Sequence, residues 1–80
     1  MTGFISHAHG NIWGAGATAA AAVEEATRNG GENIQALTIS RATPRLLRAV
    51  AEFTGGHPIY PEDVLWETID DVADLVVRAV

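Results

Sequence analysis

Glycine and proline residues divide this 80-residue chain into short segments, and this limits what it can fold into. Glycine pairs begin at Gly30 and Gly55, where left-handed backbone ends a helix at little cost. Pro44 suits the first position of a helix, whereas Pro58 and Pro61 exclude a helix between them. The chain is therefore expected to form one small domain, residues 1–80, built from short elements.

The first half predicts a hairpin, a helix and a strand. Apolar residues at 4–5 and 12–13 flank a turn-forming segment at 7–11. Thr18 is a good N-cap for an alanine-rich helix over 19–28. At 34–40, apolar and β-branched residues occupy both odd and even positions, which is typical of a central strand with both faces at least partly covered.

The second half predicts a further helix, a loop and a C-terminal helix. Residues 44–54 place one apolar stripe on a helix that follows the N-cap Thr43: Leu46, Leu47, Val50 and Phe53. Residues 57–61 are an extended loop or an edge strand. Residues 62–68 are open between helix and strand, and residues 69–80 are expected to be helical.

Together these elements predict an α+β fold. We expect an antiparallel sheet of three to four strands, with two to three helices packed mainly on one of its faces.

The charge lies in the last quarter of the chain. Residues 1–60 hold four acidic residues and four arginines, whereas residues 61–80 hold six acidic residues and Arg78, so they carry the whole net charge of −5. There is no lysine or cysteine. This composition argues against direct nucleic-acid binding, disulfides and thiolate metal sites. With no long apolar segment and no signal-peptide pattern, we expect no membrane contact and a cytoplasmic location.

The acidic residues of this segment are the candidate partner-binding site. On a helix five of the six fall on one arc, separate from the apolar stripe: Asp63, Glu67, Asp70, Asp71 and Asp74. Trp66 lies at the border between the two, on the side of Glu62. A solvated surface is the simpler interpretation. The functional one is a negative patch that contacts a basic protein surface, with Trp66 and Tyr60 as apolar anchors. The predicted site comprises Glu62, Asp63, Glu67, Asp70, Asp71, Asp74 and Trp66.

Two other patterns have weaker functional interpretations. Gly14 and Gly16 match the G-x-G-x-x-G/A pattern of a dinucleotide-binding loop, but the expected acidic residue about 20 positions later is missing. His7, His9 and His57 could in principle bind a metal, although no carboxylate accompanies them in their segments. No catalytic arrangement can be assembled from spacing. We therefore expect no enzymatic activity, no metal and no cofactor.

The chain resembles the small anti-CRISPR proteins of bacteriophages, in particular those directed at type I effector complexes. The resemblance rests on residues 13–18 before the helix, the alanines at 19–22, the Ala-Thr-Pro junction at 42–44 and the glycine pair at 55–56. These features span most of the chain, but no motif is shared among anti-CRISPR families, so no residue role is carried over.

This resemblance implies a stoichiometric phage inhibitor acting in the bacterial host cytoplasm. It would bind a Cas subunit of a type I surveillance complex, as a monomer or homodimer, and block recognition of target DNA. The alternative is a small homo-oligomeric phage or plasmid accessory or assembly module without an inhibitory role.

Overall fold

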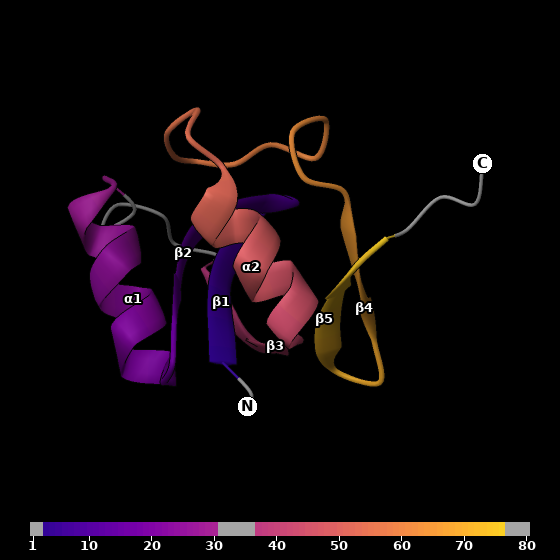
Figure 1. Cartoon of the computed structure of the whole chain (residues 1–80). Coiled ribbons are helices and arrows are strands. Elements are labelled where there is room, and N and C mark those ends of the chain that lie inside the picture. Colours follow the sequence, from indigo (N-terminus) through magenta and orange to yellow (C-terminus); the bar gives the residue numbers. More distant parts are fainter. Residues whose placement is uncertain (1–2, 31–36, 77–80) are drawn as a thin grey trace.

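A computed structural model describes residues 3–30 and 37–76 of the chain. Within these residues the chain forms one five-stranded sheet and two helices, so the predicted α+β fold is confirmed (Figure 1). The sheet has one or two strands more than expected. The elements are β1 (Gly3–Ala8), β2 (Asn11–Gly16), α1 (Ala19–Arg28), β3 (Thr38–Ala42), α2 (Pro44–Glu52), β4 (Trp66–Ile69) and β5 (Val72–Leu75).

The strands lie in the order β2-β1-β3-β5-β4. The predicted hairpin is confirmed as β1–β2, whose turn has left-handed backbone at His9 and Gly10. β1 and β3 are antiparallel, as are β4 and β5, whereas β3 and β5 are parallel. The sheet is therefore mixed rather than purely antiparallel. In the chain, α2 and the loop after it lie between β3 and the β4–β5 hairpin, and this long connection allows β5 to run parallel to β3.

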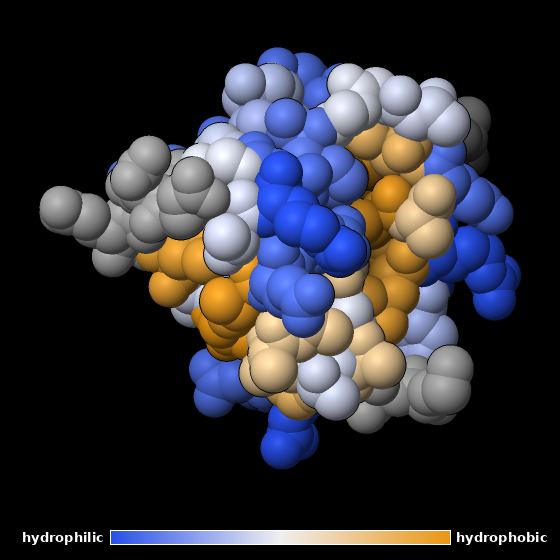
Figure 2. Space-filling view, turned by 90° about the vertical axis from the view of Figure 1, so that its left-hand side faces the viewer, coloured by the Kyte–Doolittle hydropathy of each residue, from blue (hydrophilic) through white to orange (hydrophobic). Residues whose placement is uncertain are grey.

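The two helices cover opposite faces of the sheet. In β1, the Ser6 hydroxyl donates to the carbonyl of Ala22 in α1 at 2.9 Å, whereas the neighbouring Ile5 packs in the cluster that contains Leu46 of α2. Successive residues of a strand point to opposite faces. The expectation of helices mainly on one face is thus wrong. Seen from the α1 side, a hydrophilic band separates two areas of hydrophobic surface (Figure 2).

Glycine in β2 permits the close contact between α1 and the sheet. A Cβ atom at Gly14 would lie 2.5 Å from the Ala22 carbonyl oxygen and 2.7 Å from the Ala26 nitrogen. Ala22 and Ala26 are fully buried. Gly14 and Gly16 therefore face α1 itself, and helix packing explains their spacing without a bound nucleotide.

The main core lies between the sheet and α2. Ile5, Ile12 and Leu46 are fully buried there, together with Ile59 from the proline-bracketed loop. Ile59 exchanges two backbone hydrogen bonds with Ile12, of 2.8 and 2.9 Å, at the outer edge of β2. The expected loop or edge strand at 57–61 is thus anchored by one buried residue.

The C-terminal helix expected from residue 69 is not formed: residues 66–75 are a β-hairpin. Asp70 and Asp71 have φ values of 52° and 65°, which form the two-residue turn between β4 and β5. The three- and four-residue spacing of the apolar residues, which suggested a helix, comes from cross-strand pairs of the hairpin. Ile69 and Val72 are the pair that closes the turn, and Leu65 accepts a hydrogen bond from Val76 at 3.0 Å across the hairpin.

Residues 77–80 of the expected C-terminal helix lie outside the described residues. Among the residues that the structure does describe, no helix is long and apolar enough to cross a membrane.

Replacing Gly14 tests the α1 contact. We expect Gly14→Ala to lower the free energy of unfolding by about 2 kcal/mol, since the added methyl group overlaps α1 backbone. Urea unfolding followed by circular dichroism measures the change. At Gly30, which has φ of 89° and open space around a Cβ, the same substitution should cost only about 1 kcal/mol.

The turn between β4 and β5 gives a second test, because hairpin and helix predict opposite signs. The double variant Asp70→Asn, Asp71→Gly creates the sequence most favoured in a two-residue hairpin turn, so unfolding should cost about 1 kcal/mol more. In a helix, the glycine would instead destabilise by about 1 kcal/mol. A lower urea midpoint for the double variant would contradict the hairpin.

Candidate functional site

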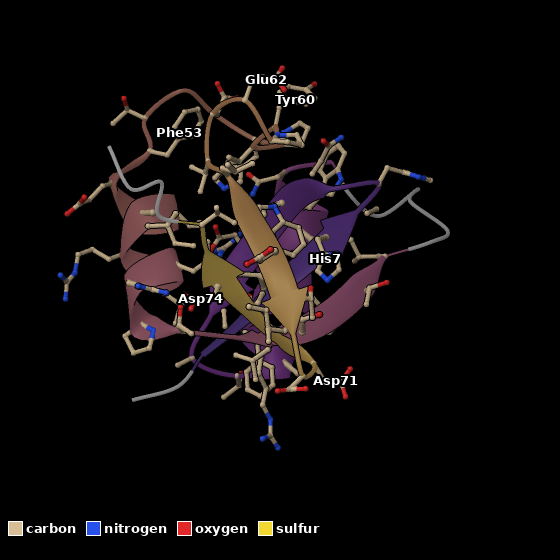
Figure 3. All side chains as sticks on the ribbon, turned by 90° about the vertical axis from the view of Figure 1, so that its right-hand side faces the viewer. His7, Phe53, Tyr60, Glu62, Asp71 and Asp74 are labelled. Atoms are coloured by element: carbon tan, nitrogen blue, oxygen red, sulfur yellow. The ribbon has the colours of Figure 1, made fainter. Side chains whose placement is uncertain are left out.

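The exposed negative charge lies along the β4–β5 hairpin and the loop before it. We call five exposed carboxylates there the acidic edge: Glu62, Asp63, Glu67, Asp70 and Asp71. The hairpin places them differently from the expected helix. Glu62 lies near one end of the hairpin and Asp71 at the other (Figure 3). The charge therefore follows the border of the sheet rather than forming one stripe.

Asp74, the sixth acidic residue of the predicted site, is bound to α2. Its carboxylate accepts hydrogen bonds from the Arg45 guanidinium at 2.7 Å to each oxygen, and from the Thr43 hydroxyl at 2.6 Å. The backbone N–H of Leu75 donates a further bond of 2.8 Å. These donors, Arg45 first, hold the pKa of Asp74 far below its usual range. Its charge is thus partly neutralised within the fold.

The other carboxylates are free of ion pairs within the described part of the chain. Asp63 accepts a backbone hydrogen bond from Tyr60 at 3.3 Å, which closes the turn before buried Val64. Glu67 lies directly across from Asp74 on the neighbouring strand, on the same face. Arg45 forms its ion pair with Asp74 and none with Glu67.

Trp66 is half-buried and held in place by the β1–β2 hairpin. Its indole N–H donates to the carbonyl of Gly10 at 3.2 Å. Its ring meets the His7 ring edge to face, with centroids 4.8 Å apart. Trp66 therefore fixes the start of β4 against the rest of the sheet, whereas Tyr60 is 45% exposed, as an anchor for a partner requires.

The sequence did not indicate a polar hollow between β3 and the β4–β5 turn. β5 pairs with β3 only at Arg41 and Ala42. Residues 38–40 of β3 therefore border an open hollow, which has a volume of about 630 Å³. Next to it, His7 Nε2 lies 2.8 Å from the Ser40 hydroxyl. Burial lowers the pKa of His7, which favours the neutral form of the ring. Polar residues of the wall are Thr38, Ser40, Arg41, Thr68, Asp70 and Asp71.

The three histidines occupy separate places. His7 contacts Ser40 and Trp66, and His9 lies in the β1–β2 turn. His57 lies 3.7 Å from a Glu25 carboxylate oxygen of α1. Within residues 3–30 and 37–76, no three histidine or acidic side chains come close enough to hold a metal ion.

Substituting Asp74 tests its structural role. At pH 7, Asp74→Asn should lower the urea midpoint, because Arg45 loses the negative charge of its partner and one of the two oxygens that accept its hydrogen bonds. A native pKa below the unfolded value of about 3.9 stabilises the fold above that pH. The advantage of the wild type should therefore shrink as the pH falls below about 4. Glu67→Gln removes a carboxylate that has no ion pair with any described residue and lies across from Asp74, so it should not lower the midpoint at either pH value.

Comparison of the chain with protein-family models, curated proteins and solved structures found no match in any of the three.

Proposed function

We propose that this protein is a non-enzymatic inhibitor that binds a basic surface of another protein through its acidic edge. The proposal rests on four exposed carboxylates that form no ion pair in the described part of the chain. Glu62, Glu67, Asp70 and Asp71 are exposed, lie along one border of the sheet and have no ion-pair partner among the described residues. Charge of one sign speeds encounter with an oppositely charged surface and disfavours other partners.

Exposed apolar side chains accompany this charge. Ile69 in β4 is 55% exposed and Tyr60 is 45% exposed. Burying such side chains at the centre of an interface supplies the affinity that screened surface charges alone do not. Together they favour a protein partner over a small cation.

The partner we propose is a Cas subunit of a type I surveillance complex. A basic surface that normally holds nucleic acid is the natural complement of exposed carboxylates, which compete there with phosphate. The resemblance to anti-CRISPR proteins directs this proposal to type I systems, in the bacterial cytoplasm. The expected consequence of binding is loss of target-DNA recognition.

Co-expression with tagged type I complexes of several subtypes tests this function. We expect the protein to co-purify with one of them and to abolish its binding to target DNA. The double variant Glu67→Gln, Asp70→Asn should weaken binding about 10-fold at low salt, and less at high salt, because the contact is electrostatic. Unchanged affinity would exclude the acidic edge as the contact surface.

A matched control removes the same charge elsewhere. Glu24→Gln with Glu52→Gln neutralises two exposed carboxylates on α1 and α2 and should leave binding within about twofold. If this variant weakens binding as much as the first, only the net charge matters. If no subtype binds the wild type, the Cas partner is wrong.

An open sheet edge favours one second candidate, a homo-oligomeric accessory module. Within the described residues β4 pairs with β5 alone, so its other edge is available to a second copy. Sedimentation equilibrium of the purified protein distinguishes the two candidates: a stable dimer, with no complex bound in co-expression, supports the accessory module.

A further inference from the structure

The outer edge of β4 has backbone groups that the sheet leaves unpaired. In a two-residue hairpin the closing pair, here Ile69 and Val72, is hydrogen-bonded, and the pairs alternate from there. The 3.0 Å bond from the Val76 N–H to the Leu65 carbonyl keeps this alternation. The N–H and C=O groups of Trp66 and Thr68 therefore point away from β5, and no described strand lies on that side.

The exposed side chains along this edge are mainly acidic, with one large apolar residue among them. Glu67 and Ile69 are both exposed and lie on the same face, since they are two residues apart in a strand. Exposed Thr68 lies on the other face, and the Asp70-Asp71 turn adds two negative charges at the end of the strand. The strand itself is held in an extended form by β5 on one side and by the contacts of Trp66 with Gly10 and His7.

We propose that this edge binds an extended segment of the partner as a sixth strand. The segment carries an arginine or lysine opposite Glu67 and an apolar residue two positions along, opposite Ile69. Backbone hydrogen bonds to Trp66 and Thr68 supply affinity, and the alternate side chains supply specificity. This inference rests on the proposed function, because it specifies the chemistry of the partner.

A basic segment fits this edge better than a second copy of the chain. Antiparallel pairing of two copies of β4 around Glu67 would place the two Glu67 carboxylates opposite each other, and like charges on paired strands are destabilising. Charged residues on an edge strand commonly prevent such self-association. The same carboxylates attract a strand of the opposite charge.

Substitutions at Thr68 separate backbone pairing from charge. Proline is tolerated in an edge strand where its missing N–H would face outward, so Thr68→Pro should keep the β4–β5 bonds while removing the central outward donor. Thr68→Val keeps that donor and serves as the matched control. Both variants retain every carboxylate of the acidic edge, and their amide spectra verify that the hairpin remains folded.

The probe is a short peptide in which threonine alternates with arginine and valine, so that arginine and valine are two positions apart. We expect it to slow amide hydrogen exchange at Trp66 and Thr68 by about 10-fold in the wild type at saturation. The amides of Glu67 and Ile69, already bonded to β5, should change little. A peptide with glutamate in place of arginine should have no effect.

Chemical-shift titration of the variants decides the inference. Thr68→Pro should bind the arginine peptide at least 10-fold more weakly than Thr68→Val. Equal binding by both, or no slowing at Trp66 and Thr68 in the wild type, would overturn strand addition at this edge. Because the peptide assay contains no Cas protein, a failed co-expression test with a positive peptide result rejects the Cas partner alone, and the reverse result rejects strand addition alone.

Discussion

One threonine at the junction of β3 and α2 connects the C-terminal hairpin to the rest of the fold. The Thr43 hydroxyl caps α2 by accepting from Leu46 at 3.3 Å and donates to Asp74 at 2.6 Å. Its backbone N–H donates to the Ala73 carbonyl at 3.0 Å, next to the short parallel pairing of β3 and β5. The helix start, the sheet order and the position of the hairpin thus depend on the same residue.

This junction also decides which charges remain available. Asp74 lies at the start of α2, where its carboxylate pairs with Arg45 and accepts a hydrogen bond from the Thr43 hydroxyl. Glu67 lies opposite Asp74 on the edge strand, and Asp70 and Asp71 occupy the turn, all three without an ion pair in the described part of the chain. The surface proposed for the partner is therefore what remains after the fold has used one carboxylate of the segment.

Local signals predicted the hairpin and both helices of the first 60 residues. The strand expected at 34–40 is β3 at Thr38–Ala42, and residues 34–36 of that prediction lie outside the described residues. Thr18 and Thr43 cap α1 and α2 as their sequences indicate, and the β1–β2 turn forms around Gly10. The C-terminal prediction failed because apolar residues three and four apart also fit a two-residue hairpin. Asp70 and Asp71 can adopt the left-handed backbone that such a turn requires, and their spacing alone did not indicate it.

The sequence by itself determined that this is a small acidic α+β domain with its negative charge after Pro61, because capping residues, glycine pairs and charge act locally. Only the tertiary structure decided which face each helix covers and how the carboxylates are arranged. Those features depend on contacts between distant residues, such as Ser6 with Ala22, Trp66 with Gly10 and Thr43 with Asp74. β5 forms a strand beside β3 where periodicity alone predicted a helix. Its pairing with β4 then places at the sheet edge a segment that the sequence had left open between helix and strand.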